Sequence, residues 1–211
     1  MIDVLRLVLE VLTNLCFVPG LIPLAQHRRH FSLFVGVTQT LAALAYCFGD
    51  FFQLDSVFIP TQNWHFVSDV LSLTYGCLLI IHLCAFEDEE RGMVLRYLAF
   101  FASWVFKYRD AWDSIYWEVL LVVGFLFVLG HAHWARPERR KRIRMDRLQR
   151  GAAFACVGLM GLLLHLRVND SHKILMGLAH CGAGLAVFEL WNVLPPPAKD
   201  KRLQDAGGAF V

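Results

Sequence analysis

The side chains best suited to chemistry lie inside apolar stretches of this chain, where an ionisable group is costly and is by default a functional hypothesis. His65, Asp69 and Ser72 are spaced at i, i+4 and i+7, which places them on one face of a helix. Cys47 lies near the end of the preceding apolar stretch, and its thiol is a competent zinc ligand. These residue types predict either a metal site or a buried polar network.

A second polar stripe lies in the last apolar stretch, where His172, Met176 and His180 are spaced at i, i+4 and i+8. We expect this stripe to lie at the same depth in a membrane bundle as Asp69. Leaving a buried carboxylate or imidazole unpaired is costly, so Asp69 and His180 are predicted to share one polar network. For His172 and His65 the alternative is an interfacial position with a water partner.

The other ionisable residues within apolar stretches are His82, Glu118, His165 and Glu189. His82 follows Asp69 by thirteen residues, about 20 Å along a helix, and is therefore expected outside any ligand set that includes Asp69. His131 and His133 adjoin Trp134 at a helix end, as in an interfacial belt. The six cysteines are expected to be small packing residues: Cys16, Cys47, Cys77, Cys84, Cys156 and Cys181.

A polar and aromatic segment, KYRDAWD at residues 107–113, separates two apolar stretches. We expect Tyr108, Arg109, Asp110 and Trp112 to form an outer hinge at the surface of the bundle. There they would meet an approaching membrane or partner first. Alternatively, they serve as an interfacial anchor of aromatic and charged side chains.

The elements that must position these residues are membrane-spanning helices. Hydrophobic residues make up 57% of the 211 residues, charged residues only 18%, and the mean hydropathy is +0.49. Charge clusters divide the apolar sequence into segments of bilayer length, which excludes a soluble globular protein. Alternation with a period of two is absent, so helices satisfy the backbone hydrogen bonds in lipid. The pattern indicates no nucleic-acid partner, and the lack of an internal repeat argues against a transporter.

We predict an all-α bundle of seven transmembrane helices in residues 1–195 and a short cytosolic tail in residues 196–211. The predicted spans are residues 4–25, 31–51, 65–86, 92–106, 114–133, 150–167 and 174–194. The first span lacks a basic leader and a small-residue cleavage site, so we expect it to be retained as a helix that runs through Pro19 and Pro23. The fourth span is short.

Loop charge predicts the orientation of the bundle. Fourteen Lys and Arg residues fall on one side of a seven-span arrangement and four on the other. The positive-inside rule therefore predicts an external N-terminus and a cytosolic C-terminus. The segment 136–150 alone contains eight basic residues, which is explained either by a role as topology determinant or by binding of anionic lipid head groups.

Several segments carry a family resemblance: NLCFVP at 14–19, HRRH at 27–30, HFVSDVLS at 65–72, the acidic turn AFEDEER at 85–91, YRDAW at 108–112 and HC at 180–181. In order and spacing they resemble the myomaker and transmembrane-protein-8 family. These are seven-helix proteins of a superfamily that includes alkaline ceramidases and adiponectin receptors. The resemblance implies a seven-helix fold with an external N-terminus, the orientation that loop charge predicts independently.

The resemblance also implies the zinc site of that superfamily. This site consists of a Ser and a His four residues apart on the second helix, an Asp on the third, and a His-x-x-x-His pair on the seventh. Asp69 matches the acidic position, with Ser72 at the familiar offset. His180 matches the second His of the pair, but Met176 stands where the first His is expected.

The second helix departs from the superfamily pattern as well. Ala43 and Cys47 stand where the Ser and His are expected, and a slip of one residue would place Tyr46 at the His position. Asp69, His180 and Cys47 are therefore the candidate zinc ligands of an incomplete site. Catalytic zinc needs about three protein ligands and an open position for water, so we expect weak or absent zinc binding and no hydrolysis.

These departures favour a non-catalytic protein. We expect a myomaker-like protein of the plasma membrane, or of Golgi and other secretory-pathway membranes, that remodels membranes in cell–cell fusion of the myoblast type. Its expected partners are membrane lipids and either a separate fusogen or further copies of itself. The alternative is a zinc-dependent hydrolase of a ceramide-like amide or a phospholipid ester. A scaffold or receptor-like bundle is a third alternative that composition does not exclude.

Overall fold

The computed structural model describes residues 2–109, 115–168 and 174–195, which are almost entirely helical, as the sequence predicts. The elements are α1 (Ile2–Leu15), η1 (Val18–Gly20, a 3-10 helix), α2 (Leu21–Gln26), α3 (His30–Phe51), β1 (Ser56–Val57), β2 (Ile59–Pro60), α4 (Thr61–Leu83), α5 (Glu89–Arg109), α6 (Ile115–Ala135), η2 (Pro137–Arg142, a 3-10 helix), α7 (Met145–Arg167) and α8 (Ile174–Trp191). The two strands form a short antiparallel hairpin with Val57 opposite Ile59. The predicted tail, residues 196–211, lies outside the described residues.

The first predicted span, residues 4–25, is not one continuous helix. α1 ends at Leu15, and the 3-10 helix η1 precedes the short helix α2. Pro19 lies in the first turn of η1. In a continuous α-helix its ring would clash with the carbonyl of Leu15, and it has no N–H to donate. The prediction of a helix that runs through Pro19 is therefore wrong.

The fourth predicted span, residues 92–106, is longer in the structure. α5 has 21 residues and begins at Glu89, within the acidic turn. Asp88 caps its start, because the backbone N–H of Glu90 donates a hydrogen bond to Asp88 Oδ1 at 3.1 Å. The helix continues to Arg109, so Lys107 lies on a helix and not in a loop.

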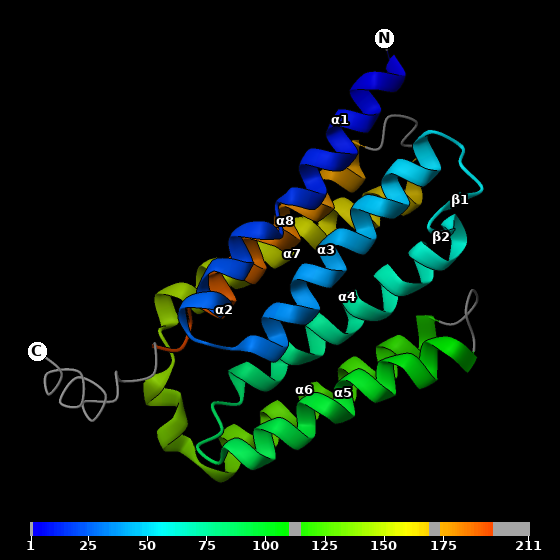
Figure 1. The fold of residues 1–211 in the computed structure, drawn as a ribbon. Coiled ribbons are helices and arrows are strands. Elements are labelled where there is room, and N and C mark those ends of the chain that lie inside the picture. Colours follow the sequence, from blue (N-terminus) through cyan, green and yellow to red (C-terminus); the bar gives the residue numbers. More distant parts are fainter. Residues whose placement is uncertain (1, 110–114, 169–173, 196–211) are drawn as a thin grey trace, which may run out of the picture.

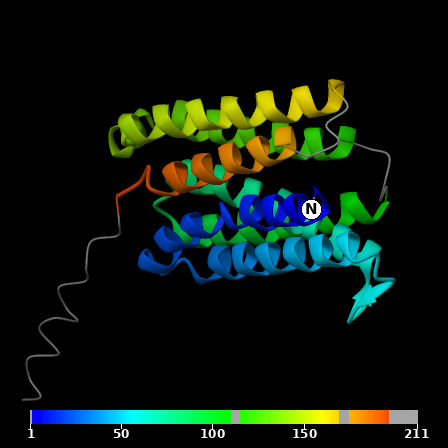
Figure 2. The same cartoon turned by 90° about the horizontal axis from the view of Figure 1, so that it is seen from above.

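The helices lie side by side in a bundle (Figure 1). α3 and α4 lie in the middle, with α1, α7 and α8 on one side and α5 and α6 on the other. Seen from above, α1 and α3 lie toward one face of the bundle and α7 covers the opposite face (Figure 2). α8 packs against both α7 and α1, so the last helix closes the bundle against the first.

The hydrophobic core is centred on α4. Tyr75, Cys77 and Leu78 of α4 are at most 4% exposed. Val35 of α3 and Trp191 of α8 belong to the same cluster of buried side chains. A helix that is apolar on every side is expected at the centre of a bundle. The central position of α4 also determines where the polar residues of its first turns, His65 and Asp69, lie in the bundle.

α7 and α8 meet through glycines. A Cβ atom on Gly182 would lie 2.5 Å from the backbone nitrogen of Gly158, and one on Gly161 would lie 2.9 Å from the backbone nitrogen of Ala179. These distances leave no room for a side chain. Small residues let the backbones of membrane helices approach closely, which strengthens van der Waals packing where lipid supplies no hydrophobic driving force.

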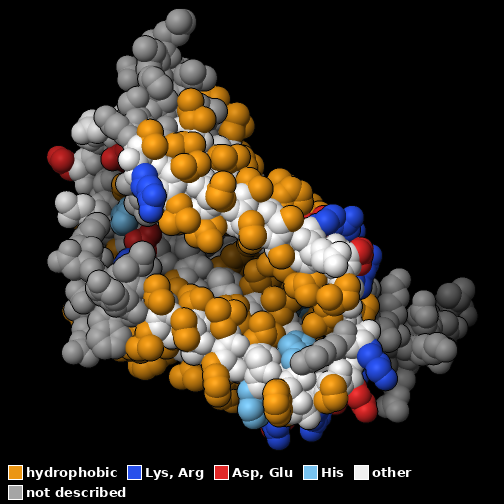
Figure 3. Space-filling view, turned by 180° about the vertical axis from the view of Figure 1, so that it is seen from behind, with side chains coloured by type: hydrophobic (Ala, Val, Ile, Leu, Met, Phe, Trp, Pro, Cys, Tyr) orange, Lys and Arg blue, Asp and Glu red, His pale blue; other side chains and the backbone are white. Residues whose placement is uncertain are grey.

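The outward faces of the helices are apolar. Phe34, Leu41, Phe101, Phe127 and Met160 come from four different helices and are each more than 60% exposed. Seen from behind, hydrophobic side chains cover the long face of the molecule, and charged side chains gather toward its ends (Figure 3). Within the described residues, α3, α4, α8 and most of α7 are long and apolar enough to cross a membrane. These are the helices of a membrane-embedded protein.

Positive charge is concentrated at one end of the bundle, which we call the basic end and which holds Glu87 and residues 136–150. Guanidinium groups of Arg136 and Arg142 lie 3.3 and 2.7 Å from the Glu87 carboxylate in the α4–α5 turn. Nearby, burial and the Arg96 guanidinium lower the pKa of Arg29 to about 10. The pairs with Glu87 join the segment after α6 to the start of α5.

A second set of ion pairs at the basic end joins α7 to α8. Glu189 is 9% exposed. Its carboxylate lies 2.9 Å from Arg147 Nη1 and 3.5 Å from Arg150 Nε. Arg150 also reaches Asp146 at 3.3 Å. Part of the basic segment therefore neutralises a carboxylate inside the bundle, which neither interpretation of its charge predicted.

Candidate functional site

A carboxylate with two nitrogen partners forms the centre of the candidate site. Asp69 Oδ2 lies 3.4 Å from His65 Nδ1, one turn earlier on α4, and 3.2 Å from Lys107 Nζ on α5. The Lys107 side chain is only 14% exposed. Because a partly buried ammonium is costly without a counter-charge, this ion pair fixes α5 against α4.

α3 contributes an aromatic ring and a thiol. The rings of Tyr46 and His65 meet edge to face with their centroids 4.7 Å apart. The next residue, Cys47, is buried, and its Sγ accepts a hydrogen bond from Asn14 Nδ2 of α1 at 3.2 Å. The adjacent residues Tyr46 and Cys47 thus connect α4 to α1 through α3.

α1 extends these contacts to α8. Thr13 Oγ1 lies 3.5 Å from Nδ1 of His180, whose ring also packs edge to face against Phe17. Thr13 and Asn14 are both buried, so two neighbouring side chains of α1 reach His180 on one side and Cys47 on the other. We call the resulting series the polar belt: His180, Thr13, Asn14, Cys47, Tyr46, His65, Asp69 and Lys107.

Ser72 lies on α4 one turn beyond Asp69 and is exposed. Its Oγ accepts a hydrogen bond from Nε2 of the buried Gln39 at 3.2 Å. This contact is a second polar link between α3 and α4, deeper along the bundle than the polar belt. It leaves Ser72 accessible from outside, where a small hydroxyl is compatible with lipid or protein neighbours.

Residues 2–181 of the chain match the model of a protein family of unknown function, DUF3522. The chain belongs to this family. No curated protein matches the chain. The matched region contains every residue of the polar belt, from Thr13 to His180, and therefore nearly the whole helical bundle of this DUF3522 protein.

In the DUF3522 bundle several of the predicted site residues are connected through contacts with other helices. Asp69 contacts His65 and Lys107, whereas His180 contacts Thr13. Between Asp69 and His180 the contacts run through α3 and α1. The shared helical face of His65 and Asp69 is confirmed by their contact.

Other predicted residues are described only in part. Met176 is half-buried on α8, one turn before His180. Tyr108 is 82% exposed next to Arg109, the last residue of α5. His172, Asp110 and Trp112 lie outside the described residues.

Two histidines outside the polar belt have structural partners. His82 is 4% exposed, and its ring lies 4.7 Å from that of Trp191. His133 Nε2 lies 2.9 Å from the carbonyl oxygen of Leu83, so it joins α6 to α4. Trp134 remains 84% exposed, as an interfacial residue would be.

The cysteines divide into three groups. Three are buried, as predicted for packing residues: Cys47, Cys77 and Cys84. Cys156 is exposed on α7. Cys16 and Cys181 approach each other, with their Sγ atoms 3.3 Å apart, and form a contact between α1 and α8 that sequence spacing did not indicate.

The sequence interpretation did not identify Lys107 and Thr13 of the polar belt, or Gln39, which contacts Ser72. Lys107 was assigned to a loop, although a long cationic side chain at a helix end can reach back along apolar surface. Thr13 and Gln39 were not singled out. Each is a polar residue within an otherwise apolar helix, and that is the signal that could have identified them.

The polar belt does not fit a zinc site of the superfamily type. Among the residues that the structure describes, no three His, Cys, Asp or Glu side chains are grouped to hold a metal ion. Asp69 is paired with the Lys107 ammonium, whose positive charge opposes a divalent cation at the same carboxylate. The contacts instead join α8, α1, α3, α4 and α5 in sequence, which is an arrangement suited to holding helices together.

Proposed function

We propose that this protein is a seven-span membrane protein that remodels membranes in cell–cell fusion without catalysing a reaction. In this proposal its location is the plasma membrane, and it acts with a separate fusogen or with further copies of itself. The resemblance to the myomaker and transmembrane-protein-8 family supports the role. The apolar outer surface of the bundle supports membrane lipids as its surroundings.

The proposal includes seven spans with an external N-terminus and a cytosolic C-terminus. In support, α1 with α2, α5 and α6 lie alongside the four helices that are long and apolar enough to cross a membrane. The basic segment 136–150 lies at one end of the bundle and the polar belt toward the other. Because positive loops tend to remain in the cytosol, the belt end is the external one in this proposal.

The observation that carries the non-catalytic interpretation is the ion pair between Asp69 and Lys107. A hydrolase of the superfamily would need that carboxylate near the metal or the attacking water. Here an ammonium group lies 3.2 Å from it, and the rest of the polar belt is engaged in contacts between helices. An external end whose helices are joined by such contacts is useful to a protein that must hold a surface toward a second membrane.

One observation favours the zinc-dependent lipid hydrolase as a second candidate. Cys47 and His180 both reach adjacent residues of α1, Asn14 and Thr13. A thiolate and an imidazole are two of the ligands that zinc accepts. Metal analysis of the purified protein separates the candidates, because one zinc per chain, lost on Cys47→Ser, would favour the hydrolase.

A cell-mixing assay tests the fusion role through the outer hinge. Two variants, Tyr108→Ala and the double substitution Arg109→Ala with Trp112→Ala, remove side chains of the predicted outer hinge. Trp134→Ala removes an aromatic side chain that is similarly exposed but lies at the basic end, and serves as the matched control. We expect fusion to be lost for the hinge variants and retained for the control at equal surface expression. Fusion that is unchanged in the hinge variants, or lost only together with surface expression, contradicts a contact role.

A further inference from the structure

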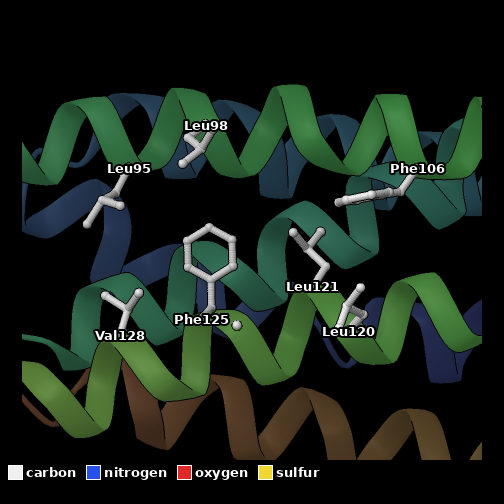
Figure 4. A pocket seen from close by; sticks show the side chains of 8 residues that line it. Leu95, Leu98, Phe106, Leu120, Leu121, Phe125 and Val128 are labelled. Atoms are coloured by element: carbon white, nitrogen blue, oxygen red, sulfur yellow. The ribbon is translucent and has the colours of Figure 1, made fainter.

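An apolar cavity separates α5 from α6. It has a volume of about 280 Å³ and is lined only by hydrophobic side chains and Gly124. Leu95, Leu98 and Phe106 project from α5, and Phe125 projects from α6 into the space between the helices (Figure 4). Empty apolar space forfeits dispersion contacts, so a cavity of this size beside lipid is a place for an apolar group.

A second, smaller pocket adjoins the first at the basic end. Its volume is about 140 Å³, and Val128 lines both pockets. Arg91, His131 and Arg136 supply its polar lining. An apolar pocket that adjoins a cationic one is complementary to an amphiphile with an apolar chain and an anionic head group.

The arginines of the cationic pocket pair with carboxylates but keep further hydrogen-bond donors. Arg91 lies 2.9 Å from Asp88, and Glu87 is shared by Arg136 and Arg142. Each of these guanidinium groups therefore uses only part of its donor set in the ion pairs. Each guanidinium has five N–H donors, and an ion pair to one carboxylate oxygen leaves several of them for a phosphate.

The length of the apolar cavity matches one leaflet of a bilayer. Leu95 and Phe106 are eleven residues apart on α5, about 16 Å along the helix axis. Half of the hydrocarbon core of a typical bilayer is about 15 Å. A head group at Arg91 and Arg136 would therefore lie at the membrane surface while its acyl chain follows the seam between α5 and α6 toward the midplane.

We propose that the α5–α6 seam binds one anionic phospholipid, with its phosphate on Arg91 and Arg136 and one acyl chain in the cavity lined by Gly124 and Phe125. This inference rests on the membrane embedding of the protein and not on a role in cell fusion. Occupancy would complete the packing between α5 and α6 at the point where protein side chains leave space.

Photo-crosslinking of the full chain tests the proposal. The protein is placed in nanodiscs of phosphatidylcholine that contain a minority of phosphatidylglycerol with a diazirine in one acyl chain. A parallel sample carries the diazirine on phosphatidylcholine. We expect the phosphatidylglycerol probe to label residues of α5 and α6 that line the cavity, in preference to the phosphatidylcholine probe. Equal labelling by both probes, or labelling confined to other helices, overturns the proposal.

Two pairs of variants locate the head and the tail. Arg91→Gln with Arg136→Gln should lower labelling by phosphatidylglycerol roughly tenfold, because charge-assisted hydrogen bonds are lost. Lys141→Gln with Arg144→Gln removes the same charge from exposed residues that do not line the pocket, and should leave labelling unchanged. Gly124→Leu fills the cavity and should abolish labelling there, whereas Gly130→Leu, on the same helix, should not.

Each of these results bears on the proposal. Labelling that survives the Arg91 and Arg136 substitutions, or that falls equally in the Lys141 and Arg144 control, overturns the head-group site. Labelling that survives Gly124→Leu overturns the acyl-chain site. Thermal unfolding of each variant is recorded in parallel, and the mapped labelling of the unaltered protein decides the outcome for any variant that does not fold.

Discussion

The hairpins α7–α8 and α5–α6 use glycine in opposite ways. Gly158 of α7 and Gly182 of α8 face each other, and the two backbones meet where their side chains are missing. A Cβ atom on Gly124 or Gly130 of α6 would instead have open space for 4 Å around it, and Gly124 lines the cavity beside α5. A small residue therefore brings membrane helices together only where it faces a partner. Elsewhere it leaves room for a ligand.

The two hairpins also differ in how they are attached to the bundle. α8 runs against α7 on one side and α1 on the other. The α5–α6 hairpin has ion pairs near both of its ends, Lys107 with Asp69 and Arg136 with Glu87. We infer that α7–α8 is the fixed part of the bundle and α5–α6 the adjustable part.

Gly182→Ala should lower the free energy of unfolding by about 3 kcal/mol, because a Cβ atom there collides with the backbone of Gly158, which cannot move aside as a side chain can. Thermal unfolding in detergent measures the change. Gly130→Ala is the matched control, and it should be neutral or stabilising by up to about 1 kcal/mol, since alanine favours the helix. Equal effects of the two substitutions would remove the contrast between the hairpins.

Glu189→Gln should lower the free energy of unfolding by about 2 kcal/mol, because it leaves the partly buried Arg147 guanidinium without its carboxylate. The matched control is Asp146→Asn, which removes a carboxylate from exposed ion pairs of the same helix pair and should change stability by less than about 0.5 kcal/mol. If the control is as destabilising as Glu189→Gln, general loss of charge and not the buried pair explains the effect.

Asp69→Ala should lower the free energy of unfolding by about 1 kcal/mol, because Lys107 loses its counter-charge. Amide hydrogen exchange should rise in α5 and α6 and stay constant in α7 and α8, since the ion pair attaches the first hairpin only. Lys107→Met should produce the same pattern. Faster exchange at His180 and its neighbours in α8 would instead support the direct coupling of Asp69 to His180 that the sequence predicted.

Gly124→Leu should raise the free energy of unfolding in detergent by about 0.5 kcal/mol, because the new side chain fills apolar space between α5 and α6. The same change at Gly161 of α7 should be strongly destabilising, since a Cβ atom there meets the backbone of Ala179. A loss of stability at Gly124 comparable to that at Gly161 would indicate that α5 and α6 already pack closely.

The sequence predicted the helices well because each apolar stretch has bilayer length and is bounded by charge. It failed where a single residue changed the backbone, as Pro19 does after α1. For the polar belt, helical spacing correctly placed His65 and Asp69 on one face. It did not identify their neighbours, because depth along a helix says nothing about which helix lies beside it. Lys107 became a partner of Asp69 only through the packing of α5 against α4.

The contact between the first and last helices has a consequence for how the chain is made. Cys16 and Cys181 are 165 positions apart, so at roughly 5–20 residues per second α1 leaves the ribosome roughly 10–30 s before α8. During that interval Thr13 has no α8 to meet, although it is a polar group at membrane depth. The bundle can close only when synthesis of its membrane part is nearly complete, and until then α1 must be sheltered by lipid or by the insertion machinery.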